Sequence, residues 1–219
     1  MEIIKFMKLD LRKILQQYKL LVLLAIVASV VTVAGDMGNW GLLYMGFAGV
    51  IMATAPLFAD KTAERGFYNL LPAHDGSRMR GRFLAGTVFV GITSLIGLVI
   101  AVVCNMIQGR PQQNVIESFL YVWAAGVIFN SIQYVILSLM KSKNPQILGL
   151  VRIIPGFIMF FGGSYLQSLS DEADQNVLIA LTEVIEYVIN HLMLCAWMLM
   201  GSALVLTVIL TEIAVRQER

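Results

Sequence analysis

The chain has 219 residues, of which 58% are hydrophobic and 14% are charged, and its net charge is +2. Soluble domains carry about 25% charged residues, so this composition excludes a water-soluble protein that hides its apolar side chains in one core. Lipid is the solvent that accommodates such a surplus of apolar surface. Because each spanning helix needs roughly 20 apolar residues, several spans would use most of the chain. No soluble catalytic domain fits in the remainder.

The first segment, residues 1–18, is predicted to be a basic amphipathic helix. Ile4, Met7 and Leu11 recur at helical spacing, with basic residues between them. A helix of this kind lies in the membrane interface, parallel to the bilayer. The alternative is that it forms a cytosolic extension of the first span. No small-residue cleavage site follows it, so it is not interpreted as a secretory signal.

Six apolar runs follow, separated by polar turns, and each is predicted to be a transmembrane helix. The fold class predicted is therefore an all-α integral membrane protein, with residues 1–219 as one domain. Between the last two runs, the acidic segment 167–190 is predicted to contain a short helix on the outer surface. The predicted spans are residues 20–34, 40–59, 83–107, 116–140, 147–166 and 191–211.

Basic residues predict the orientation of the chain. Five Lys or Arg precede the first span, five lie between the second and third spans, two lie between the fourth and fifth, and two lie in the tail. All of these segments fall on one side of the membrane, whereas the opposite side holds only Arg110. Positive residues favour the cytoplasmic side. Both termini are therefore predicted to be cytoplasmic, in a multi-pass protein of the cell membrane.

The sequence offers no catalytic constellation. It contains no Gly-Lys dipeptide, which a phosphate-binding P-loop requires. His74 and His191 are predicted on opposite sides of the membrane and cannot share a metal. Cys104 and Cys195 each stand alone in an apolar run, so no disulfide is predicted. We expect a chain that is not an enzyme, holds no cofactor or metal of its own and has no nucleic-acid partner.

Only mildly polar residues are embedded in the predicted spans. Asn130 and Gln133 lie one helical turn apart in the fourth span. They either hydrogen-bond neighbouring helices or line a translocation path, and the packing role is favoured. Arg152 is predicted to extend to the cytoplasmic interface. Because ion-coupled carriers place charged groups near the midplane, the energy for any transport is expected to come from elsewhere.

The loop of residues 60–82 is the most informative segment. Charged residues lead, an apolar and aromatic group follows, and Pro72 ends that group. Apolar anchors flanked by charge suit a docking site, because the anchors supply binding energy and the charges set the register. A solvated loop whose aromatic residues dip into the interface is equally consistent with the pattern. The candidate docking residues are Lys61, Glu64, Arg65, Phe67, Tyr68 and Leu71.

In layout, the chain resembles the permease subunits of type-2 ABC exporters, in particular small bacterial permeases whose ATPase is a separate polypeptide. The resemblance rests on the basic amphipathic start, the six spans and the amphipathic outer segment before the sixth. Its one local motif follows the second span and consists of Glu64, Leu70-Leu71-Pro72, Arg78 and Arg82. The sequence departs from the family pattern at His74-Asp75-Gly76, in the turn before the third span.

The resemblance implies a mechanism and a set of partners. Two permease subunits, identical or paralogous, would pair within the lipid, and each would dock on an ABC ATPase that holds ATP and magnesium. The segment around Glu64 to Leu71 would be the coupling helix, with Glu64 and Arg65 transmitting force and Phe67 and Tyr68 as the docking knob. The N-terminal helix would be a second ATPase contact. Amphipathic or antimicrobial peptides, or other hydrophobic cargo, are the implied substrates.

Three other classes of function remain open at this point. One is a membrane ligand-capture or accessory subunit, which an aromatic-lined outer pocket would favour. Another is an intramembrane enzyme, which would need paired Glu or His residues near the outer leaflet. A purely structural membrane protein is a third possibility. An adjacent gene for a P-loop ATPase would discriminate among them.

Overall fold

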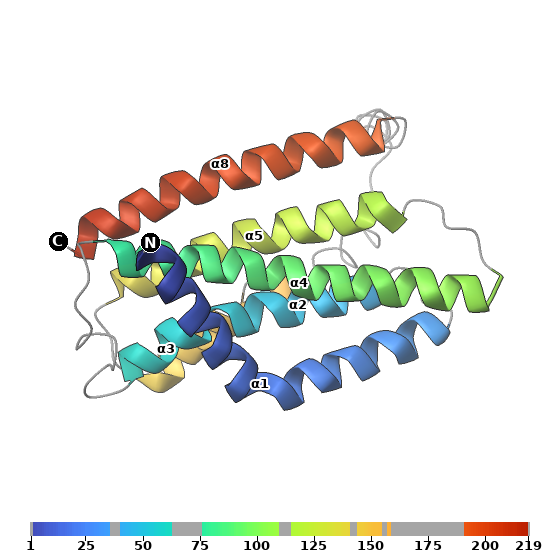
Figure 1. The fold of residues 1–219 in the computed structure, drawn as a ribbon, viewed down its shortest axis with the longest axis horizontal. Helices are drawn as coiled ribbons and strands as arrows, with labels where there is room; N and C mark the ends of the chain where they lie inside the picture. Colours follow the sequence, from blue (N-terminus) through green and yellow to red (C-terminus); the bar gives the residue numbers. More distant parts are fainter. Residues whose placement is uncertain are drawn as a thin grey trace, which may run out of the picture.

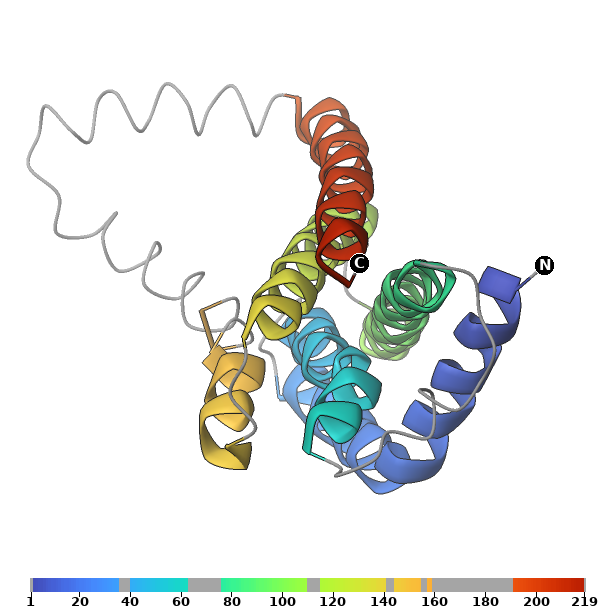
Figure 2. The same ribbon diagram turned by 90° about the vertical axis from the view of Figure 1, so that its left-hand side faces the viewer.

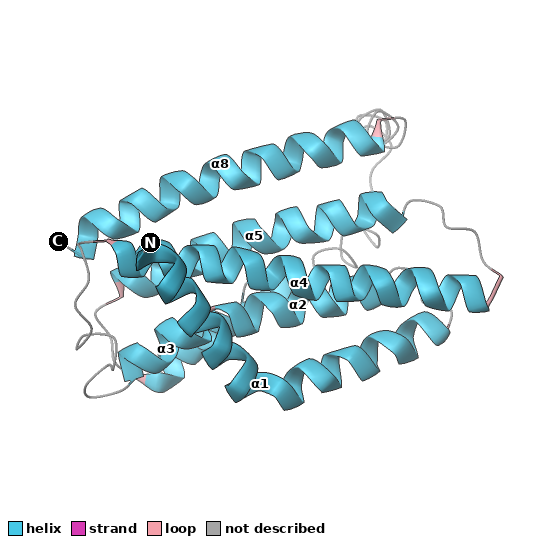
Figure 3. Ribbon diagram, in the orientation of Figure 1, coloured by secondary structure: helices cyan, strands magenta, loops and turns pink. Residues whose placement is uncertain are grey.

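The computed structural model describes residues 2–35, 40–62, 76–109, 115–140, 144–154, 157–158 and 191–218, and every regular element in these ranges is a helix (Figure 3). The predicted all-α class is confirmed for this part of the chain. Among the described residues, five helices are long and apolar enough to cross a membrane. The chain is therefore a multi-pass membrane protein.

Helix α1 spans Glu2–Ala34 and joins the predicted interfacial segment to the first predicted span without a loop. It is bent, because Tyr18 has φ −117° and ψ 15°, outside the helical region. This bend falls at the predicted boundary between residues 1–18 and 20–34. Figure 1 shows the two halves of α1 running in different directions.

The second predicted span, 40–59, consists of two helices rather than one. Helix α2 spans Trp40–Ala53 and helix α3 spans Ala55–Thr62, with a turn at Thr54 between them. Pro56 explains the interruption, since it has no N–H to donate to the carbonyl four residues earlier and its ring crowds that carbonyl. Residues 41–59 are still apolar and long enough to cross a membrane, but the turn at Thr54 within them was not predicted, although Pro56 signalled it.

Helix α4 spans Ser77–Ile107 and begins well before the predicted start at residue 83. Arg78, Arg80 and Arg82, which were assigned to a loop, lie in its first turns. Arginine is a good helix former, so a charged segment need not be irregular when it leaves the bilayer. Gly76 precedes the helix with φ +79°, a left-handed conformation that glycine adopts without strain.

The remaining described helices overlap the predicted spans. Helix α5 spans Val115–Leu139. A short helix, Pro145–Ile154, covers the start of the fifth predicted span, and residues 159–190, including the predicted outer helix, lie outside the described part. Helix α8 spans Leu192–Glu218 and continues through the segment predicted as a tail. Cys104 and Cys195 are free and half-buried.

Helices α2, α4 and α5 form the centre of the bundle. Helix α4 packs against α1, α2 and α5, while α8 packs chiefly against α5. Figure 2, an end view, shows α1 and α8 as the outer helices on opposite sides. Their apolar side chains face outward, as Leu24 and Val208 illustrate with exposures of 58% and 64%. Such surfaces suit a lipid environment, where no water opposes them.

The helix ends that border the predicted cytoplasmic segments lie together at one end of the bundle. Figure 1 shows both termini, the end of α3 and the start of α4 at the same end of the molecule. The end of α5 lies there as well, because α5 runs antiparallel to α4 (Figure 1). The described helix ends that border the segments predicted on the cytoplasmic side therefore lie at one end of the bundle, called here the basic end. Which compartment this end faces remains a prediction.

Close packing of α4 against α5 depends on glycine. A Cβ atom at Gly86 would lie 2.5 Å from Asn130 Nδ2 and 2.9 Å from Tyr134 Cε2. Five residues further along α4, a Cβ at Gly91 would lie 3.1 Å from Trp123 Nε1. Small residues at such positions let helix backbones approach closely, which is the main source of packing energy between membrane helices.

We predict that Gly86→Val destabilises the bundle by about 1–3 kcal/mol, because the added methyl groups force Asn130 and Tyr134 apart. The matched control is Gly201→Val in α8, where an added Cβ meets nothing within 4 Å. Unfolding in mixed detergent and SDS micelles measures both. Equal stability of the two variants would show that α4 and α5 do not pack closely at Gly86.

Candidate functional site

The predicted coupling segment falls largely outside the described residues. Glu64, Arg65, Phe67, Tyr68 and Leu71 are not described, and the role assigned to them stays a prediction. The sixth residue of that group, Lys61, is described in its backbone only, within the last turn of α3. What the structure provides is the frame of the segment: α3 leads into it and α4 leads out of it.

The N-terminal half of α1 is attached to the start of α4. Phe6, Asp10 and Ile14 form its buried stripe at helical spacing. A Cβ at Gly81 would lie 2.6 Å from Phe6 Cβ, so the two backbones approach closely here. Beside this contact, Asp10 and Arg82 form a buried ion pair, with Oδ2 and Nε 3.7 Å apart.

Lys13 lies close enough to this pair to be affected by it. Burial lowers the pKa of the Lys13 amine, the Asp10 carboxylate raises it and the Arg82 guanidinium lowers it again. Removing Asp10 alone would leave the buried Arg82 guanidinium uncompensated, which is strongly destabilising. The pair therefore fixes the N-terminal segment against the helix that leaves the predicted coupling segment.

A second ion pair attaches α8 to the same part of α4. Arg80 donates from Nε and Nη2 to the two carboxylate oxygens of Glu212, at 2.9 Å each. This two-point geometry is the strong form of an Arg–carboxylate contact. The pair is about half exposed, so water screens it, and it orients the helices more than it stabilises them.

Four polar residues of α5 reach four different helices. Gln133 Nε2 donates to the Arg152 carbonyl of the short helix at 2.6 Å, and Ser131 shares a hydrogen bond of 2.8 Å with Thr207 of α8. Tyr134 donates its hydroxyl to the Ala53 carbonyl at the end of α2, at 2.8 Å. Asn130 lies fully buried against Gly86 of α4.

These contacts bear on the two roles that the sequence left open for Asn130 and Gln133. Gln133 has a helix-packing contact in the structure, and Asn130 lies in a helix–helix interface. Interhelical hydrogen bonds in membranes are worth about 0.6–2 kcal/mol each. A role in lining a translocation path stays a prediction for both residues.

The expectation that Arg152 extends to the interface was wrong. Its exposure is 9%, and its guanidinium lies among protein groups. Nε donates to the Ile51 carbonyl beside the α2–α3 break, and Nη1 donates to the Tyr18 hydroxyl at 3.0 Å. Its Cζ atom lies 4.9 Å from the Tyr18 ring centroid and 5.7 Å from that of Phe58. Aromatic faces attract a desolvated cation, which explains why it remains inside.

Arg152 therefore connects two interruptions of regular structure with helix α3. Tyr18 is the bend of α1, Ile51 lies beside the break between α2 and α3, and Phe58 belongs to α3, which leads to the predicted coupling segment. We call Tyr18, Ile51, Phe58 and Arg152 the arginine cluster. Sequence reasoning missed it, although an arginine inside an apolar run and a proline inside a predicted span were both visible.

Comparison with known proteins gives one match. A family model described as ABC-2 family transporter protein matches residues 6–211. The match includes the N-terminal segment, the bundle and most of α8. No functionally curated protein and no solved structure matches the chain significantly.

We predict that Arg152→Met lowers the free energy of unfolding by about 1–3 kcal/mol, because the Ile51 carbonyl and the Tyr18 hydroxyl lose a donor inside the bundle. Tyr18→Phe removes only one acceptor, so its effect should be smaller. Thermal unfolding of the detergent-solubilised protein measures both variants. An Arg152→Met protein as stable as the wild type would contradict the bonding described here.

Proposed function

The chain belongs to the ABC-2 family of transporter proteins, as an ABC transporter permease, and from this premise we propose that it exports amphipathic or hydrophobic cargo. Membership follows from the match over residues 6–211, and this one observation carries the proposal. The driving energy would come from ATP hydrolysis in a separate ATPase subunit. Permeases of this class supply the path through the membrane and not the ATPase chemistry.

In the proposed arrangement, the basic end of the bundle faces the cytoplasm and the ATPase docks there. The excess of Lys and Arg in the segments of this end supports the orientation. Both termini would then be cytoplasmic. The segment after α3, with Lys61, Glu64, Arg65, Phe67 and Tyr68, would be the docking element, and Leu71 would complete its apolar part.

The proposed transmission of force starts at α3. Because α3 is separated from α2 by a turn at Thr54, it can move without bending one long helix. Phe58 of α3 lies against the guanidinium of Arg152, which also bonds Tyr18 in α1. A push on α3 would therefore reach both the bend of α1 and the short helix Pro145–Ile154.

The proposed cargo class follows from the character of the spans. Their apolar surfaces suit a hydrophobic or amphipathic molecule better than an ion or a sugar. Peptides with an apolar face, including antimicrobial peptides, are the proposed cargo. A second permease subunit, identical or paralogous, would complete the path, and the exposed apolar residues of the second half of α1 offer a surface for it.

We predict that the affinity-tagged permease, purified from its native membranes, brings with it an ATPase that contains a P-loop. Phe67→Asp and Glu64→Lys should abolish this co-purification, because one removes an apolar anchor and the other reverses a charge at the proposed contact. Glu117→Lys, at the start of α5 and far from the basic end, is the control for charge reversal. Retention of the ATPase by both loop variants would refute the proposed docking element.

We predict that a cysteine at position 216 is shielded in intact cells and one at position 110 is labelled. The background is a Cys104→Ala, Cys195→Ala chain, and the reagent is a membrane-impermeant maleimide. Arg216 lies in the last turn of α8, at the basic end, and Arg110 lies in a connection predicted outside. Permeabilisation should expose position 216. Labelling of that position in intact cells would reverse the proposed orientation.

A further inference from the structure

The outer face of the N-terminal half of α1 carries a charge pattern that the bundle does not neutralise. The inner stripe, Phe6, Asp10 and Ile14, faces α4. Lys8, Arg12 and Lys19 lie on the exposed face, and none of them has a partner among the residues that the structure describes. Lys8 and Arg12 are separated by four residues, the spacing at which like charges destabilise a helix. An external anion would remove this cost.

The same face is also apolar. Leu11 and Leu15 lie between the basic residues, and Leu15 is 53% exposed. Together with Gln16, these five residues border a shallow hollow of about 690 Å³. Apolar side chains flanked by cations match a molecule that has both an anionic group and hydrocarbon.

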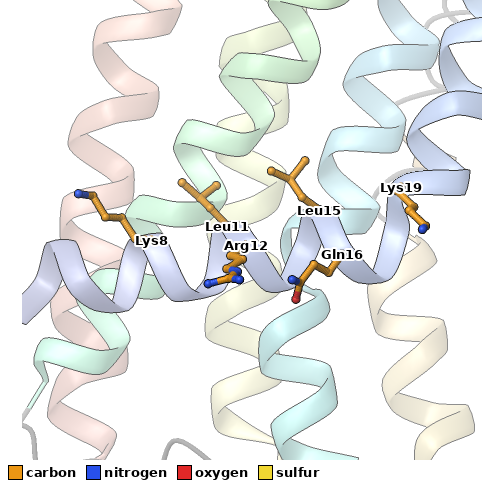
Figure 4. Close-up of a pocket in the computed structure, with 6 residues that line it drawn as sticks. All are labelled: Lys8, Leu11, Arg12, Leu15, Gln16 and Lys19. Carbon is orange, nitrogen blue, oxygen red and sulfur yellow. The ribbon is translucent and has the colours of Figure 1, made fainter.

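The directions of the side chains specify how such a molecule would lie. Figure 4 shows Leu11 and Leu15 pointing to the side on which the second half of α1 continues. Arg12 and Gln16 point to the opposite side, and Lys8 and Lys19 stand at the two ends of the leucine pair (Figure 4). Because the second half of α1 is apolar and long enough to enter the membrane, the leucines face hydrocarbon and Arg12 faces water.

We propose that this face, made of Lys8, Leu11, Arg12, Leu15 and Lys19, binds an anionic phospholipid of the leaflet at the basic end. The phosphate lies near Lys8 and Arg12, which are one helical turn apart, and the acyl chains lie against the two leucines. Lys19, about 16 Å from Lys8 along the helix axis, adds positive charge at the other end of the face. Each Lys or Arg near an anionic membrane surface contributes binding energy worth about a fivefold change in affinity. Lipid is chosen over an acidic protein because the leucines point into the membrane layer rather than away from it.

This proposal needs the membrane orientation of α1 but not the ATPase of the proposed function. The Asp10–Arg82 ion pair and the Gly81 contact hold the segment in place from behind, so the outer face is presented by a fixed helix. A fixed helix loses little conformational entropy when it binds, and this favours a lipid that stays bound.

The test uses the full-length permease in a neutral detergent, without any ATPase. Phosphatidylglycerol and phosphatidylcholine are titrated separately, and native mass spectrometry gives the Kd for the first bound lipid. We expect tighter binding of phosphatidylglycerol. Lys8→Gln and Arg12→Gln should each raise its Kd about fivefold and leave the Kd of phosphatidylcholine unchanged. Arg216→Gln, which removes an exposed cation from α8, is the matched control and should have little effect.

Two results would overturn the proposal. One is equal affinity of the wild-type protein for the two lipids. The other is loss of ATPase co-purification in Arg12→Gln with unchanged lipid binding, which would assign the face to an acidic protein surface. Elution of the variants as the wild-type species in gel filtration shows that they fold. Failure of the ATPase pull-down described above would leave the lipid result intact, so the two proposals can fail separately.

Discussion

A break in a transmembrane helix exposes backbone carbonyls to a medium that cannot hydrogen-bond them, and the basic half of this bundle is organised around one such break. Pro56 interrupts the second span, and two neighbouring carbonyls accept hydrogen bonds from distant side chains: Ile51 from Arg152 and Ala53 from Tyr134. The donors come from the short helix and from α5. The interruption therefore ties three elements together, because the short helix and α5 must keep their positions relative to α2 for these hydrogen bonds to form.

The bend of α1 is stabilised by the same guanidinium. Tyr18 leaves helical geometry at the point where the N-terminal segment turns along the bundle, and its hydroxyl accepts from Arg152. On the other side of the bend, the Asp10–Arg82 pair fixes the segment to α4. One buried arginine thus stabilises the bend and another the orientation of the segment. A charged residue inside a membrane protein usually marks function. Here Arg82 lies in α4 and Arg152 contacts α3, the two helices that flank the predicted coupling segment.

The sequence predicted the helices better than their interactions. Hydropathy predicted the five long apolar helices that the described residues contain, since long apolar runs leave one choice of environment. The limits of α4 and α8 were wrong because charge was taken as the end of a helix, whereas Arg80 and Glu212 lie on helical turns that pair with each other. The break at Thr54 was readable from Pro56. The partners of Arg152 were not, since Tyr18, Ile51 and Phe58 are separated from it by 94 to 134 residues of sequence and meet it only when the bundle forms.

Helix α5 shows how a bundle with few charged residues in its spans can still fix the relative positions of its helices. Its residues 130–134 place an amide, a hydroxyl, a second amide and a phenol within little more than one helical turn, and each is directed to a different neighbour. Apolar packing alone would tolerate sliding of helices in lipid, because hydrocarbon side chains and lipid tails are nearly equivalent. Directed hydrogen bonds do not tolerate it. Sliding α5 along α8, the short helix or α2 would break a hydrogen bond to that helix, and sliding it along α4 would move Asn130 away from Gly86.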